Sequence, residues 1–157
     1  MSDSQALGTW NKLSGSAFGR WLFSRVVCIK APYFGSIRPV FDILEPGRAT
    51  ARMRKRRAVT NHIGTVHAIA MANLCELVAG TMTEVSLPTS MRWIPRGMQI
   101  DYLDKAQTDL SATATFPEIN EGEAQDIVVP VAVTDSDGKV VVRADITMYV
   151  SPRSKTT

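Results

Sequence analysis

The side chains best suited to chemistry lie between Thr60 and Glu76, in the sequence T-N-H-I-G-T-V-H-A-I-A-M-A-N-L-C-E. Gly64 and Thr65 supply turn and helix-cap chemistry just before an apolar helical run. The first backbone N–H groups of a helix have no acceptor within the helix, so they suit a polarised carbonyl oxygen. Glu76 adds a carboxylate that can act as a base or a nucleophile. The segment therefore indicates chemistry at a carbonyl group.

His67 and Glu76 are nine residues apart on the predicted helix. At about 100° and 1.5 Å per residue, this spacing turns the helix roughly two and a half times and separates the pair by roughly 13 Å along the axis. The two side chains then point to opposite sides, so one chain cannot bring both to one substrate. Two antiparallel central helices related by a two-fold axis would set Glu76 of one subunit opposite the His67 turn of the other. The spacing predicts that an active site is shared across a dimer.

The order Thr60-Asn61-x-Ile63-Gly64-Thr65-x-His67, with an acid nine residues on, resembles the active-site segment of hotdog-fold acyl-thioesterases of the phenylacetate-pathway and thioesterase-superfamily type. The long N-terminal segment and residues 91–95 (M-R-W-I-P) resemble most a bacterial hotdog subfamily of undefined function. The resemblance implies hydrolysis of acyl-CoA or acyl-carrier thioesters at a dimer interface. The catalytic residues that it implies are Asn61, His67 and Glu76.

The same resemblance implies a role for each residue. Glu76 would be the general base or nucleophile, Asn61 would orient the water or the Glu76 carboxylate, and His67 would build the site rather than transfer protons. The helix start near His67-Ala68-Ile69 would be the oxyanion site, whose N–H groups stabilise the developing charge. Substrate contacts are expected at Gly64, Thr65, Ala68 and Ile69.

The chain departs from the family pattern at two places. The family usually has His-Gly-Gly, whereas this chain has His67-Ala68-Ile69, so larger side chains stand where a backbone amide approaches the substrate. Some members hold the attacking water with a Ser or Thr on the strand after the helix, where a rough alignment places Ile94 or Pro95. These departures keep an alternative open, a hotdog domain that binds acyl-CoA or a fatty acyl chain without turnover.

Each candidate residue also has a structural interpretation. Glu76 can pair with an arginine or a backbone amide. The His67 ring can bond backbone groups of the helix start, and Asn61 and Thr65 can serve only as turn and cap residues. Contacts in the folded chain are needed to separate these interpretations from the catalytic ones.

The basic residues are concentrated between Arg48 and Arg57, and the formal net charge is only +3. Such a cluster favours a local anion site over nucleic-acid binding, which usually adds stacking aromatics that this segment lacks. Arg54 and Arg56 are candidate contacts for the phosphates of coenzyme A, and the alternative is a solvated strand edge that discourages edge pairing. Coenzyme A would enter as part of the substrate, so we expect no separate cofactor and no nucleic-acid partner.

Length and composition predict one domain, because 157 residues with 45% hydrophobic and 21% charged residues fit a single core. Two cysteines, Cys28 and Cys75, and two histidines indicate neither a disulfide framework nor a zinc site, so no metal is expected. Charged residues interrupt the apolar stretch around residues 21–23, which is too short for a bilayer span or a signal-peptide core. We expect a cytoplasmic protein with no membrane partner.

Hydrophobic periodicity predicts the order helix, two strands, helix, four strands. Residues 3–29 have a mostly helical rhythm, and an almost wholly apolar helix is predicted from about Thr65 to a stop at Gly80. Strands are predicted at residues 40–44, 48–56, 92–103, 109–116, 127–134 and 139–150. We expect an α+β hotdog fold, an antiparallel sheet wrapped around a central helix. It would form a single domain over residues 1–157, with residues 1–36 as an N-terminal helical extension, and would assemble as a homodimer or a tetramer.

Overall fold

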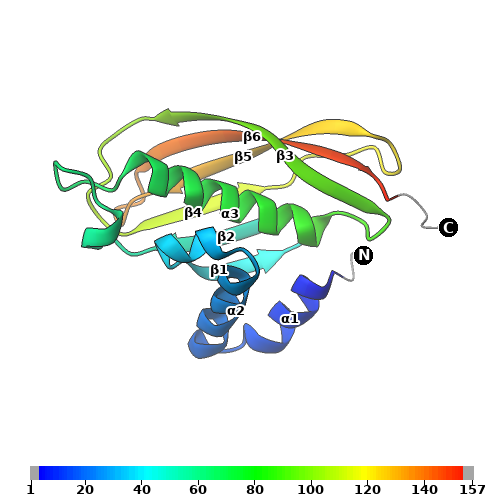
Figure 1. The fold of residues 1–157 in the computed structure, drawn as a ribbon, viewed down its shortest axis with the longest axis horizontal. Coiled ribbons are helices and arrows are strands. Elements are labelled where there is room, and N and C mark those ends of the chain that lie inside the picture. Colours follow the sequence, from blue (N-terminus) through cyan, green and yellow to red (C-terminus); the bar gives the residue numbers. More distant parts are fainter. Residues whose placement is uncertain (1–3, 154–157) are drawn as a thin grey trace.

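A six-stranded sheet packs against one long helix in the computed structural model, which describes residues 4–153 (Figure 1). The strands lie in the order β1-β2-β4-β5-β6-β3, and every neighbouring pair is antiparallel. In chain order the elements are α1 (Gln5–Leu13), α2 (Ala17–Lys30), the 3₁₀ helix η1 (Pro32–Ile37), β1 (Val40–Glu45), β2 (Arg48–Met53), the 3₁₀ helix η2 (Arg57–Val59), α3 (Ala68–Ser86), β3 (Met91–Tyr102), β4 (Leu110–Thr115), β5 (Gln125–Thr134) and β6 (Val140–Pro152).

This arrangement confirms the predicted hotdog fold with its central helix and N-terminal helical segment. All six predicted strands are present, because alternation of buried and exposed residues is a direct consequence of a sheet with one covered face. The second strand ends at Met53 rather than at Arg56. Beyond Met53 the Lys55 N–H donates to the carboxylate of Asp109 (2.8 Å) instead of to a neighbouring strand.

The central helix α3 covers Ala68–Ser86 rather than residues 65–80, so Gly80 lies in its interior and is not a stop. A Cβ atom at Gly80 would lie 2.9 Å from the Trp93 ring, so the glycine admits a side chain from β3. The Trp93 indole N–H donates to the Glu84 carboxylate (2.8 Å), which fixes the ring over the helix. The helix ends two residues before Pro88, because the residue preceding a proline is driven to extended backbone.

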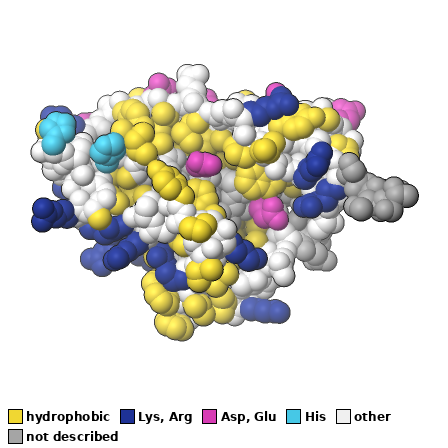
Figure 2. Space-filling view, in the orientation of Figure 1, with side chains coloured by type: hydrophobic (Ala, Val, Ile, Leu, Met, Phe, Trp, Pro, Cys, Tyr) yellow, Lys and Arg dark blue, Asp and Glu magenta, His cyan; other side chains and the backbone are white. Residues whose placement is uncertain are grey.

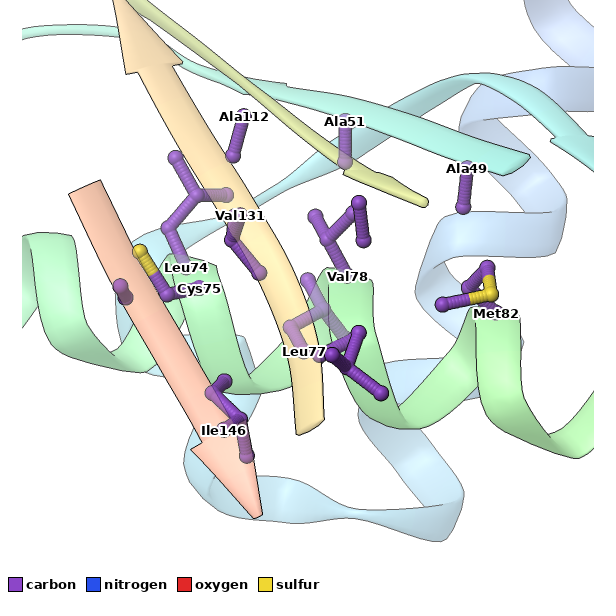
Figure 3. Packing of buried hydrophobic residues seen from close by; sticks show 14 of the residues in the cluster. Ala49, Ala51, Leu74, Cys75, Leu77, Val78, Met82, Ala112, Val131 and Ile146 are labelled. Carbon is purple, nitrogen blue, oxygen red and sulfur yellow. The ribbon is translucent and has the colours of Figure 1, made fainter. Parts of the chain in front are cut away.

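The buried face of the sheet presents small side chains to α3. Ala49 and Ala51 of β2 and Ala112 and Ala114 of β4 are fully buried. Figure 3 shows labelled alanines directed toward the helix, where Leu74 and Val78 fill the space. Small residues on the sheet let the helix approach closely while its own larger side chains complete the packing. By length and hydropathy α3 also passes as a membrane span, but 61% of that apolar window is buried inside the molecule.

The N-terminal helices attach to the β1 edge of the sheet through an aromatic chain. Trp10 of α1 meets Phe23 of α2 edge to face at 5.1 Å, and Phe23 meets Phe41 of β1 at 5.8 Å. The Ser24 hydroxyl accepts from the Phe41 N–H (2.9 Å) and donates to the Arg20 carbonyl (2.8 Å). The two helices therefore cover β1 and leave β3, at the opposite edge, uncovered in Figure 1.

Candidate functional site

Asn61 organises the turn that leads into α3. Its side-chain oxygen accepts from the N–H groups of Ile63 and Thr65 (both 3.1 Å), and its side-chain nitrogen donates to the Thr65 hydroxyl (2.8 Å). Gly64 takes the positive φ of 79° that this turn requires. Thr65 is not the cap of the helix, because α3 begins at Ala68 and its N-cap is His67. Asn61 and Thr65 are bonded to each other within the turn.

His67 is the N-cap of α3. Its Nδ1 accepts from the Ile69 N–H (3.1 Å), and its carbonyl accepts from the N–H groups of Ala70 (3.0 Å) and Met71 (3.2 Å). Within residues 4–153 the Ala68 N–H has no hydrogen-bond acceptor. Of the two expected oxyanion donors, therefore, Ala68 is free to bind a substrate oxygen, and Ile69 would first have to release the imidazole.

A tyrosine outside the predicted site lies beside this helix start. The Tyr102 hydroxyl donates to the Ala68 carbonyl (3.2 Å). With Asn61, Thr65 and Met71, it lines a hollow of about 380 Å³. Burial, and then the nearby Cys75, raise the pKa of Tyr102. No local motif marks this residue, because its place depends on β3 ending beside the start of α3.

Glu76 lies on a different hollow, of about 440 Å³, on the open face of α3. The walls are mainly apolar and include Phe34 of η1 and Trp93 and Pro95 of β3. Glu76 is half-buried at this hollow, whereas its neighbours Cys75 and Leu77 on α3 are buried. Figure 2 shows hydrophobic side chains gathered over α3 and the N-terminal helices on this face, with acidic side chains among them.

His67 lines a third hollow, of about 180 Å³, together with Asn73 and Ser36. Asn73 is only 5% exposed, and its side-chain nitrogen donates to the Ser36 hydroxyl (3.2 Å). Its side-chain oxygen is buried and has no partner within the described part of the chain. The single chain thus places Asn61, His67 and Glu76 on three separate hollows and does not bring them together.

Arg54 and Arg56, the expected phosphate contacts, line one groove beside β2. The Arg54 side chain is exposed, and its Nε lies 3.9 Å from the Asp109 carboxylate. The Arg56 guanidinium donates to the Ser36 carbonyl. Burial, and then the positive charge of Arg38, lower the pKa of Arg56. For residues 4–153, no group of three or more His, Cys, Asp or Glu side chains is placed to hold a metal ion.

The model of one protein family, described as a domain of unknown function (DUF4442), matches residues 19–150. No curated protein matches the chain. Among solved structures, the genomics protein APC5556 is 46% identical with a TM-score of 0.83, over 94% of this chain and 98% of that one. PA5026 from Pseudomonas aeruginosa, described as a protein of unknown function and probable thioesterase, is 21% identical with a TM-score of 0.75, over 83% and 93% of the two chains. The thioesterase HI1161 from Haemophilus influenzae is 12% identical with a TM-score of 0.70, over 79% and 85%.

Proposed function

This chain belongs to the DUF4442 family, and on that premise we propose that it is a thioesterase that hydrolyses acyl-CoA or acyl-carrier thioesters. The observation that carries the proposal is Glu76, a half-buried carboxylate on the wall of an apolar hollow. Such a hollow accommodates an acyl chain while the carboxylate reaches the reacting carbonyl. Structural neighbours described as thioesterases share the fold and support this choice of chemistry.

In the proposed reaction, Glu76 acts at the carbonyl carbon of the thioester. As a general base it takes a proton from water, and the resulting hydroxide adds to the carbonyl carbon. The carbonyl oxygen becomes an oxyanion that accepts from the Ala68 N–H at the start of α3. When the intermediate collapses, the C–S bond breaks and the thiolate leaves with the proton that Glu76 holds. As a nucleophile, the Glu76 carboxylate would instead attack the carbonyl carbon, so that the C–S bond breaks, the thiolate leaves and an acyl anhydride forms. Water would then hydrolyse the anhydride to the free acid and the Glu76 carboxylate.

Completion of this site requires a second copy of the chain. Because His67 and Glu76 of one subunit line separate hollows, the proposed site joins Glu76 of one protomer to the helix start of its partner. The edge strand β3 supports such pairing, since residues 97–102 pair regularly with β6 and, within residues 4–153, have no strand on their other side. We propose a homodimer, which a tetramer would contain as its unit.

The test is hydrolysis of short, long and aromatic acyl-CoA thioesters, which is monitored by the release of free thiol. Loss of a general base lowers the rate by about 10² to 10⁴, so Glu76→Gln should abolish most of the turnover. Glu84→Gln is the matched control, because Glu84 lies on the same helix and hollow and a glutamine still accepts from Trp93. Turnover that survives Glu76→Gln in the folded protein would contradict the proposed role of Glu76.

The alternative function is a hotdog domain that binds an acyl-CoA or fatty acyl chain without turnover. It is favoured by the helix start, where the side chains of Ala68 and Ile69 replace glycines and the Ile69 N–H is already bonded to His67. A pure binder would be stabilised by acyl-CoA, with the same rise in Tm in wild type and Glu76→Gln, and would release no thiol from any substrate in the panel.

A further inference from the structure

A basic groove of about 580 Å³ lies between α2, the end of η1 and β2. We call it the cationic groove and define it by the ten residues that line it: Ala17, Trp21, Arg25, Ile37, Arg38, Val40, Arg52, Arg54, Lys55 and Arg56. Six of these are Arg or Lys and none is acidic, a composition that suits a multiply charged anion. Figure 2 shows Lys and Arg side chains gathered below the end of the molecule that carries the histidines.

Much of this charge is not neutralised by the protein. Asp42 pairs with Arg52 at 2.9 Å, and Asp109 approaches Arg54 at 3.9 Å. Within residues 4–153, the other four cations of the groove have no carboxylate within 4.0 Å; they are Arg25, Arg38, Lys55 and Arg56. Four of the six cations therefore remain available to an external anion.

The Arg25 and Arg56 guanidiniums are held against the backbone. Each donates one N–H to a main-chain carbonyl, that of Pro39 for Arg25 and that of Ser36 for Arg56. In both arginines the Nε is buried and has no acceptor within the described residues. These contacts hold the two cations in place through the protein's own backbone, so an anion need not order them on binding.

Arg38 adds backbone strain to this like-charge cluster. Its φ of 49° and ψ of 56° lie in the left-handed region, and it is the one residue other than glycine with positive φ in residues 4–153. Its charge acts on Arg56, whose pKa it helps to lower. A strained residue that brings like charges together is typical of a binding site, because the ligand relieves the repulsion.

Trp21 gives the cationic groove an aromatic wall. Its indole is 45% exposed and stacks on Phe18 with ring centroids 5.7 Å apart. The basic segment at residues 48–57 contains no aromatic residue, but α2 supplies one in the folded chain. Cations beside an exposed indole suit a ligand that joins phosphates to a purine base.

The groove also adjoins the start of α3. Ile37 lines both the cationic groove and the hollow of His67, and Arg56 bonds Ser36, which lines that hollow too. We propose that the cationic groove binds the phosphorylated adenosine end of coenzyme A, so that the carrier of the thioester is a nucleotide and not an acyl-carrier protein. This inference rests on the proposed thioesterase function and names its carrier.

The test is calorimetric titration of the full-length protein with adenosine 3′,5′-bisphosphate, which has no thioester. Arg38→Asn removes a cation and keeps a residue that tolerates left-handed backbone, so the fold should be retained. We expect it to weaken binding about tenfold, the loss typical of a charge-assisted hydrogen bond. Trp21→Leu should weaken bisphosphate binding and leave inorganic phosphate unchanged. Arg143→Gln, which removes an exposed cation from β6, is the control and should bind as wild type does.

Several results would overturn the inference. One is wild-type protein, folded by its Tm, that does not bind the bisphosphate. A second is an affinity for the bisphosphate that is equal in wild type and Arg38→Asn. A third is hydrolysis of acyl-pantetheine or acyl-carrier protein with a kcat/KM at least as high as that for acyl-CoA. RNA binding lost in the same variants, without bisphosphate binding, would assign the groove to another partner. The two proposals fail separately: bisphosphate binding without turnover would refute the thioesterase alone, and turnover with KM unchanged in Arg38→Asn would refute the groove alone.

Discussion

The thiol of Cys75 is the most deeply enclosed titratable group among the residues whose pKa is shifted. It lies on α3 with no exposed surface, and burial raises its pKa from 9.0 to about 12. At neutral pH the side chain is an uncharged thiol and packs as a small apolar group. Its titration therefore contributes nothing to stability at neutral pH and becomes unfavourable only in alkaline solution.

The free energy of unfolding should fall as pH rises through the range between the two pKa values of Cys75. The folded chain holds the proton up to about pH 12, whereas the unfolded chain releases it near pH 9, so alkali favours unfolding. By linkage, this group alone removes about 1.3 kcal/mol between about pH 8 and about pH 10. Urea unfolding of Tyr102→Phe with and without Cys75→Ala measures it, because Tyr102 is the group whose pKa the Cys75 thiol also raises. An identical pH dependence in the two proteins would contradict the prediction.

At the scale of elements, the contact between α3 and β3 depends on the absence of a side chain at Gly80. Alanine favours a helix by about 0.8–1.0 kcal/mol over glycine, but the new Cβ would meet the Trp93 ring at 2.9 Å. Trp93 cannot yield freely, because Glu84 holds its indole N–H. Steric overlap in packed regions costs about 1–3 kcal/mol. The free-energy cost of the steric overlap should exceed the gain in helix propensity.

We predict that Gly80→Ala destabilises the protein by about 1 kcal/mol in urea unfolding, net of the gain in helix propensity. In the Trp93→Leu background the overlap is gone, and the same Gly80→Ala change should be stabilising. A double-mutant cycle with Gly80→Ala and Trp93→Leu gives the coupling free energy between the two positions directly. If Gly80→Ala has the same sign in both backgrounds, the glycine has no packing role toward Trp93.

The elements differ in how far the sequence predicts them. Strand positions are predictable, because alternation is local to each strand. The ends of α3 are not, since Gly80 is typical of a helix stop and its actual partner, Trp93, comes from another element. For the candidate site, the nine-residue spacing predicts opposite sides of the helix for His67 and Glu76, and the two residues line separate hollows of the chain. Spacing cannot place Trp21 beside the basic strand, because that depends on how α2 packs along β1.

At the scale of the whole molecule, assembly decides whether the proposed active site is complete. The variant Gln99→Lys with Asp101→Lys adds positive charge to the regular part of the β3 edge, where like charges oppose strand pairing. Sedimentation should show dimer for wild type and monomer for this variant, with loss of hydrolysis. The control, Gln107→Lys with Glu121→Lys, adds the same charge at exposed loop positions and should remain dimeric. An active monomer would refute a shared site.

The alanines beneath α3 have a consequence for how proteins of this shape diverge. Because Ala49, Ala51, Ala112 and Ala114 leave no spare volume, a larger residue at any of them would push the helix off the sheet. Apart from Gly80, which Trp93 covers, the open face of α3 is less constrained, since it borders a hollow bounded by side chains from α1, α2, η1 and β3. Substitutions should therefore accumulate on the open side of α3, where they can change substrate preference without disturbing the fold.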